Sequence, residues 1–215
     1  MSFTKQKKYY SHERSDLLDL LPANMKLEKV LDVGCGSGAT GQYLKNYLQA
    51  KEVAGIEMNA DMAKQAKTIL DRVIVGDIQQ IELPFDQHYF DCIICADILE
   101  HLYDPWSILF KLKNYLKNTG CLLLSVPNIQ HWSIIARLLA GKWYYQDEGI
   151  LDNTHIRFFT RKSLGGLIER CGFQIEKISG AMGKETRLVN CLTLGLFSNF
   201  LSFRYFVLAR KSNRK

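Results

Sequence analysis

Short apolar runs alternate with amphipathic stretches along most of this chain. The runs, rich in Val, Ile, Leu and Phe, predict strands at 29–33, 52–56, 72–75, 90–96, 121–126, 173–179 and 203–209. Apolar positions at helical spacing predict helices near 39–49, 60–70, 105–117 and 161–171. Runs such as CLLLSV are apolar at consecutive positions, as in strands that are covered on both faces. The pattern therefore predicts an α/β fold with a mostly parallel sheet and helices on both faces.

Two segments depart from this alternation. Residues 127–160 form a long insert rich in Trp, Tyr, His and Phe, and inserts at the carboxyl end of a strand often act as lids or substrate walls. Residues 188–201 are apolar and lie before the last strand, near a basic terminus. Fourteen residues are too short to span a bilayer, which leaves two interpretations: a helix packed on the sheet, or an interfacial membrane contact.

Composition limits the class of protein. The chain has 215 residues, of which 47% are apolar and 23% charged, so residues 1–215 are expected to form a single domain. The net charge of +6 comes from the two ends, and residues 9–203 carry a net charge of −2. This near-neutral body favours a small-molecule partner and no nucleic acid.

The cysteines and the terminus predict a compartment. The sequence MSFTKQKKYY has no apolar leader, and no apolar run reaches the roughly 20 residues of a transmembrane segment. Six cysteines are therefore expected to be reduced and mostly buried, in a cytoplasmic protein. Cys92 and Cys95 have the spacing of a zinc or redox pair, but in a strand their side chains would point to opposite faces.

A glycine-rich turn is the most informative feature. The first predicted strand runs into Gly34, Gly36 and Gly38, and a helix is expected to begin near Ala39. Glycine permits positive φ angles and lets a ligand approach the backbone, and the helix N-terminus adds free N–H groups. The turn therefore predicts a site for a nucleotide or a nucleoside.

The glycines alone leave two ligands open. Gly34-x-Gly36-x-x-Ala39 fits the dinucleotide fingerprint, and Glu57 follows at the distance of a ribose-binding acid, so a nicotinamide or flavin enzyme is one interpretation. Asp32 favours another ligand, because its carboxylate would repel a pyrophosphate and attract a cationic cofactor. Asp77, after the third strand, is either an adenine-binding acid or a turn residue.

Several motifs in order resemble a known family. The stretches VLDVGCGSG and FDCIICADILEHLYDPW, with Glu57 and Asp77 between them, resemble the class I S-adenosylmethionine-dependent methyltransferases. The later stretches LLLSVPNIQHW and DEGILDNTHIRFFTRKSL resemble a bacterial subgroup related to the ubiquinone-biosynthesis O-methyltransferases and the MetW-like proteins. The likeness spans roughly residues 9–210. It implies a seven-stranded Rossmann-like sheet whose last strand is antiparallel, and a helix at about 9–21 that covers the cofactor.

The resemblance also implies a set of residues that bind S-adenosylmethionine, with S-adenosylhomocysteine as the product. Glu57 would accept the ribose hydroxyls, Asp77 and Ile78 would hold the adenine, and Ala96 and Asp97 would line the sulfonium site. Tyr10 and Arg14 would lie on the covering helix, where Arg14 either binds the cofactor carboxylate or stays at the surface. The full implied set is Arg14, Asp32, Gly34, Cys35, Gly36, Gly38, Glu57, Met58, Asp77, Ile78, Ala96 and Asp97.

Methyl transfer to a hydroxyl also requires a group that removes a proton. His101 follows the fourth strand and His155 ends the insert, so both are candidate catalytic residues, with structural roles as the alternative. The stretch from Asp97 to His101 resembles one that holds a divalent cation in some relatives, but an Asp stands first here, and no metal is predicted. His131 is either an acceptor-pocket residue or a helix-start contact.

The sequence therefore predicts an enzyme that transfers a methyl group from S-adenosylmethionine to a hydroxyl of a small-molecule acceptor. The acceptor could be a sugar or a lipid-linked compound, and a peripheral membrane contact stays open. Two alternatives remain: a non-catalytic nucleoside-binding or assembly protein on the same fold, and a nicotinamide-dependent oxidoreductase. The sequence does not predict an oligomeric state.

Overall fold

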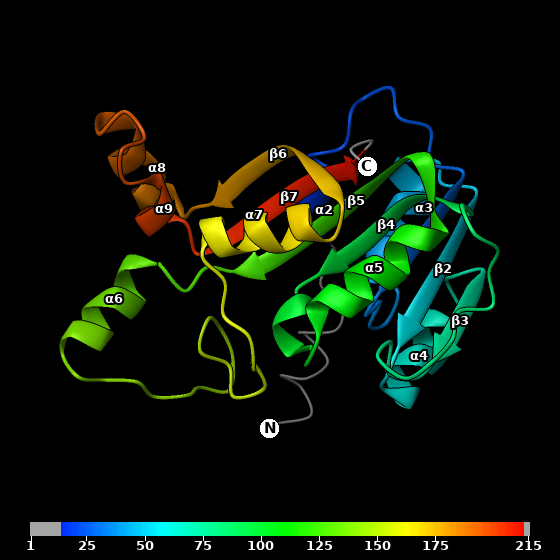
Figure 1. The fold of residues 1–215 in the computed structure, drawn as a ribbon, viewed down its shortest axis with the longest axis horizontal. Coiled ribbons are helices and arrows are strands. Elements are labelled where there is room, and N and C mark those ends of the chain that lie inside the picture. Colours follow the sequence, from blue (N-terminus) through cyan, green and yellow to red (C-terminus); the bar gives the residue numbers. More distant parts are fainter. Residues whose placement is uncertain (1–13, 213–215) are drawn as a thin grey trace.

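A single seven-stranded sheet organises the chain in the computed structural model, which describes residues 14–212 (Figure 1). The strand order is β3-β2-β1-β4-β5-β7-β6. The strands are β1 (Lys29–Val33), β2 (Glu52–Glu57), β3 (Arg72–Val75), β4 (Phe90–Ala96), β5 (Leu116–Pro127), β6 (Phe173–Ala181) and β7 (Arg204–Lys211). Strands β1 to β5 pair in parallel, and β7 runs antiparallel between β5 and β6. This confirms the expected Rossmann-like sheet with its antiparallel last strand.

Helices cover both faces of the sheet, as predicted. Leu17 of α2, Leu44 of α3 and Ala66 of α4 belong to one buried cluster. Leu109 of α5 and Leu167 of α7 belong to the cluster on the other face. The helices are α2 (Ser15–Leu18), α3 (Ala39–Tyr47), α4 (Ala60–Ala66), α5 (Pro105–Tyr115), α6 (Trp132–Leu139), α7 (Arg161–Arg170), α8 (Lys184–Leu192) and α9 (Ser198–Leu201), with a 3₁₀ turn η1 (Leu99–His101).

The cysteines follow from this layering. Cys92 packs in the cluster with the α2 and α3 side chains, and Cys95 packs in the opposite cluster. The prediction that this pair lies on two faces of one strand is therefore confirmed. Five of the six cysteines are buried, as expected, and Cys191 on α8 is exposed.

Some boundaries differ from those predicted. β5 begins at Leu116, five residues before the expected start, because the chain leaves α5 directly in an extended conformation at its C-cap. The covering helix expected at about 9–21 is described only from Arg14 onward, where α2 spans four residues. Tyr10 lies outside the described residues.

The two irregular segments both leave the sheet at the corner where β5 ends and β7 begins. Residues 127–160 carry α6 before they return toward α7, and α8 and α9 lie between β6 and β7 (Figure 1). No residue of α8 or α9 is buried, so the expectation of a helix packed on the sheet is wrong for this stretch. Among residues 14–212, no helix has both the length and the apolar character needed to cross a membrane.

Candidate active site

A cavity of about 630 Å³ opens at the carboxyl ends of β1, β2, β3 and β4. Parallel strands end on the same edge of a sheet, so residues distant in the sequence meet there. The predicted residues that line the cavity are Arg14, Asp32, Gly34, Cys35, Gly36, Glu57, Met58, Asp77, Ile78, Ala96, Asp97 and His101. Gly38 and His155 are the two members of the predicted set that do not line it.

The glycine turn is held against the tip of β2. The N–H groups of Gly34 and Cys35 both donate to the carbonyl of Ile56, at 2.8 and 3.0 Å. Gly34 has a φ of 74°, and a Cβ there would lie 2.1 Å from Cδ1 of Ile98. Gly38 has a φ of 90° and packs near Ala66, so it shapes the start of α3 and does not face the cavity. The turn therefore requires glycine for its conformation as well as for ligand access.

Glu57 is buried and held by backbone donors. Its Oε2 accepts from the N–H of Gly36 at 2.9 Å, and its Oε1 accepts from the N–H of Asn59 at 2.7 Å. Each carboxylate oxygen has a further lone pair that can accept a ligand hydroxyl. Because the Gly36 N–H already donates to a carboxylate, it is not available to a phosphate. This geometry disfavours a pyrophosphate in the turn.

Asp32 is a buried carboxylate on the strand that leads into the turn. It is 3% exposed, and its Oδ2 has no hydrogen-bond partner among the described residues. Burial raises the pKa of Asp32, the Arg14 guanidinium lowers it, and the Glu57 carboxylate adds a smaller rise, so that the pKa is about 7. A cation placed against Asp32 would stabilise its charged form.

Asp77 fits both of its expected roles. It lines the cavity, and its Oδ1 also accepts from the N–H of Gln79 at 2.9 Å, which makes it a turn residue. Gln79 lines the cavity as well and was not singled out from the sequence, although it follows Asp77 by two positions. Met58 lies at the rim and is largely exposed.

Asp97 is held on all sides at the tip of β4. The Ser125 hydroxyl donates to its Oδ1 at 2.7 Å, and the guanidinium groups of Arg14 and Arg204 each contact its Oδ2 at 2.9 Å. Arg14 therefore lines the cavity as part of an ion-pair network and is not the free surface residue of the alternative interpretation. Asp97 has a φ of 54°, a conformation that these contacts hold in place.

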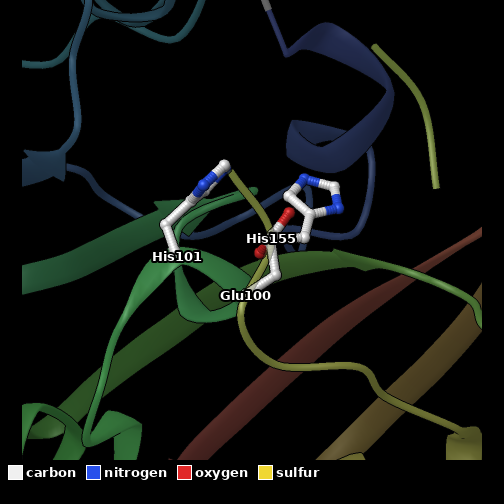
Figure 2. A group of neighbouring side chains, drawn as sticks. All are labelled: Glu100, His101 and His155. Atoms are coloured by element: carbon white, nitrogen blue, oxygen red, sulfur yellow. The ribbon is translucent and has the colours of Figure 1, made fainter. Parts of the chain in front are cut away.

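Three titratable side chains meet beside the cavity. Figure 2 shows Glu100 pointing up between the imidazole rings of His101 and His155, whose ring centres lie 4.7 Å apart. The end of the insert is fixed beside Glu100, because the N–H groups of Ile156 and Arg157 both donate to the carbonyl of Glu100. The predicted pair of histidines is therefore brought together, with His101 lining the cavity and His155 buried behind it.

Hydrogen bonds define the tautomers of both rings. His101 Nδ1 lies 3.3 Å from the carbonyl of Thr154, and His155 Nδ1 lies 3.1 Å from the carbonyl of Ile150. A carbonyl only accepts, so these contacts place a hydrogen on Nδ1 of each ring, and in a neutral ring Nε2 then has the lone pair. Burial lowers the pKa of His101, and the neighbouring His155 lowers it further. The neutral form of His101, which can accept a proton, is therefore favoured.

Glu100 has an environment that favours its protonated form. It is 1% exposed, and both side-chain oxygens lack a hydrogen-bond partner among the described residues. Burial raises the pKa of Glu100, and the nearby Asp97 carboxylate acts in the same direction. Ligand atoms of Glu100, His101 and His155 lie within 4.8 Å of one another, so these donors could also hold a divalent cation.

The insert supplies cavity residues that the sequence did not single out. Asp147, Asp152, Asn153 and Thr154 line the side of the cavity next to His101. Their position depends on how the insert folds back, which residue spacing does not predict. His131, by contrast, is the N-cap of α6, and its Nδ1 lies 2.8 Å from the Ser133 hydroxyl. Its helix-start interpretation is the one that the structure shows.

Comparisons with known proteins find similarity over most of this chain. A family model described as a methyltransferase domain matches residues 5–178. A ubiquinone biosynthesis O-methyltransferase of Xanthomonas axonopodis pv. citri is 28% identical over 190 residues, which cover 81% of this chain and 74% of that protein. A protein of the same name from Glaesserella parasuis is 33% identical over 110 residues, which cover 47% of this chain and 46% of that protein, less than half its length.

A solved structure shares the fold. The crystal structure of a SAM-dependent methyltransferase from Archaeoglobus fulgidus has a TM-score of 0.68 and covers 96% of this chain and 94% of its own. Its sequence is 20% identical, so the likeness concerns the fold.

Proposed function

Because the chain belongs to the class I S-adenosylmethionine-dependent methyltransferases, we propose that it methylates a hydroxyl oxygen of a small-molecule acceptor. The observation that carries this proposal is the cavity itself. It joins Asp32, whose buried Oδ2 has no hydrogen-bond partner in the described part of the chain, to Glu57, a carboxylate with free lone pairs, and to the neutral imidazole of His101. These groups suit an ammonium, a ribose diol and an acceptor hydroxyl in turn.

The proposed cofactor position follows from charge and hydrogen bonding. The ammonium of S-adenosylmethionine would lie against Asp32, and its carboxylate against Arg14. The ribose hydroxyls would donate to Glu57, and the adenine would lie between Asp77 and Ile78. In this position the sulfonium faces Ala96 and Asp97, on the side of the cavity that His101 lines.

The proposed reaction is a single displacement. The acceptor oxygen forms a bond to the methyl carbon while the carbon–sulfur bond breaks, and the sulfonium becomes the thioether of S-adenosylhomocysteine. Nε2 of His101 takes the hydroxyl proton. The Thr154 carbonyl orients the ring through Nδ1, and His155 supports it from behind. The alignment of the acceptor oxygen with the methyl group, together with the exclusion of water, would supply much of the remaining rate enhancement.

The acceptor class is supported by two observations. The relatives named above are O-methyltransferases by name. The acceptor side of the cavity is lined by the polar residues Asp147, Asp152 and Asn153, which suit a hydroxylated compound. The cluster of Glu100, His101 and His155 is proposed to handle protons without a metal ion.

Calorimetry and a transfer assay test this function. We expect saturable binding of S-adenosylhomocysteine and none of NAD. With labelled S-adenosylmethionine, we expect label in catechol, a phenolic hydroxyl acceptor, and less in aniline, a nitrogen acceptor. Methyl transfer at an unchanged rate in the presence of a metal chelator would support the proposal that the cluster handles protons without a metal ion. Binding of NAD in place of the sulfur nucleoside would refute the proposed function, and label in aniline alone would refute the hydroxyl acceptor.

A further inference from the structure

Two segments that project from the sheet share one base. We define the apolar arm as residues 130–145, which include α6, and residues 184–203, which include α8 and α9 (Figure 1). The Asn128 amide donates to the carbonyls of Asn199 and Ser202, at 2.7 Å each. The N–H of Asn128 also donates to the carbonyl of Phe203 at 3.0 Å. The two segments therefore leave the sheet from a common hydrogen-bonded corner.

The apolar arm carries most of the exposed large hydrophobic side chains. Fourteen of the twenty in the described part of the chain lie on it, including Leu139 at 84% exposure and Leu194 at 96%. α8 and α9 contain no buried residue, so these side chains do not contribute to the core. Apolar surface that is gathered in one place on a folded protein marks an interaction site.

The polar residues of the arm indicate what kind of surface it contacts. Four exposed cationic residues flank the apolar ones, Arg137, Lys142, Lys184 and Arg187, against one acid, Glu185. Two tryptophans and two tyrosines lie in the first segment of the arm. Leu and Phe accompanied by Trp, Tyr and an excess of Lys and Arg are typical of the interface of a bilayer. Protein interfaces, in contrast, are depleted in Lys.

We propose that the apolar arm docks on an anionic lipid bilayer. The nine residues of α8 are too short to cross it, so the arm would lie in the interface with its leucines and phenylalanines among the acyl chains. The cationic residues would contact acidic headgroups. The insert that carries α6 also supplies Asp147 and Asp152 to the cavity, so docking holds the cavity beside the membrane.

Vesicle flotation of the full chain tests this proposal. We expect the protein to float with vesicles of phosphatidylcholine and phosphatidylglycerol in equal parts, and less with phosphatidylcholine alone. Added salt would reduce binding to the anionic vesicles. Trp132 and Trp143 lie on the arm, so binding would shift the tryptophan emission to shorter wavelength.

Paired variants separate the arm from the rest of the surface. Leu192→Glu with Leu196→Glu changes two exposed side chains, and we expect vesicle binding to fall at least about tenfold. Arg137→Gln with Lys142→Gln would remove much of the preference for anionic vesicles. Tyr47→Glu, at an equally exposed position on α3, is the matched control and should bind as the parent does. Binding of S-adenosylhomocysteine by each variant verifies that it is folded.

Three results would overturn the proposal. One is the absence of flotation with either kind of vesicle, and another is equal flotation of the leucine variant and the parent chain. The third is a parent chain that dimerises in sedimentation experiments but ignores vesicles, with the leucine variant monomeric. That result would make the arm an interface between two copies of this chain.

Discussion

The two ends of the sheet's carboxyl edge are built in opposite ways. At the β1–β2 end, polar groups are buried and held by backbone donors, as Glu57 is held by Gly36 and Asn59. At the β5–β7 corner, the apolar side chains of α8 and α9 are not buried in the core. The first arrangement fixes the positions of a few atoms to fit a small ligand. The second presents a broad apolar surface.

One network joins the two ends. Asp97 at the tip of β4 contacts Arg14 over the cavity and Arg204 at the start of β7. Arg204 is paired in register with Pro127, where the insert begins. The two ends therefore differ in the kind of partner they can bind, although these contacts link them.

The largest effect is expected at the turn. Gly36→Val places a side chain in the cavity wall at a φ of 54°, so binding of S-adenosylhomocysteine should be abolished, measured by calorimetry. Gly141→Val is the matched control, because Gly141 has a φ of 69° and open space around it. It carries the same backbone strain and should bind normally. Equal loss in both variants would mean that strain, and not the cavity, explains the result.

His101→Gln tests the proposed base. We expect kcat to fall by about 10²–10³ while the dissociation constant of S-adenosylhomocysteine stays nearly unchanged, since the ring acts on the acceptor. The pH–rate profile should also lose its acidic limb. His131→Gln, in which an α6 N-cap residue is changed, is the control and should keep the parent rate. A parent-like rate in His101→Gln would exclude this histidine as the base.

Asp32→Asn removes the buried negative charge. We expect the affinity for S-adenosylhomocysteine to fall by about 10- to 100-fold in calorimetry, because a charged partner of the ammonium is lost. Asp104→Asn is a matched change at the N-cap of α5, and it should leave binding unchanged and the melting temperature nearly unchanged, because Asn caps a helix about as well as Asp. If Asp32→Asn binds as the parent does, the ammonium does not lie against this residue.

The pH dependence of binding follows from the same carboxyl. The pKa of Asp32 is about 7 without ligand, and the ammonium stays charged below that pH, so acidification must weaken binding. Between pH 7 and pH 5.5 we expect a loss on the order of tenfold, measured by calorimetry. Asp32→Asn should show a flatter profile over this range. A parent profile as flat as that of the variant would contradict the raised pKa.

The smallest effect is on stability. A carboxyl whose pKa is raised by folding binds its proton more tightly in the folded state, so the ligand-free protein loses stability as the pH rises from about 4 to about 7. Asp32→Asn should therefore raise the melting temperature at pH 8 by a few degrees, and leave it nearly unchanged at pH 4. A variant that is less stable at pH 8 would show that Asp32 has a partner in the folded protein.

Much of the fold and of the β1–β2 end of the sheet could be predicted from the sequence. The glycine turn, Glu57 and Asp77 lie at or near the ends of strands, and parallel strands bring those ends together without further information. Asn59 and Asp104 cap their helices through their side chains, and both are residue types that favour a helix start. In this region short-range sequence and topology determine the geometry.

The rest depends on long-range contacts that spacing does not reveal. Arg204 reaches Asp97 from more than a hundred residues away, and the insert brings His155 to Glu100 by folding back on itself. The stretch 188–201 was ambiguous because a buried helix and an exposed apolar helix share one composition. Whether such a helix is buried or exposed depends on whether other parts of the chain pack against it.

A crystal structure with S-adenosylhomocysteine at pH 7 would show directly where the nucleoside binds. The account predicts the amino group of the nucleoside against Asp32, its ribose hydroxyls on Glu57 and its adenine beside Asp77. An empty turn at saturating nucleoside, or ribose hydroxyls bound away from Glu57, would contradict it.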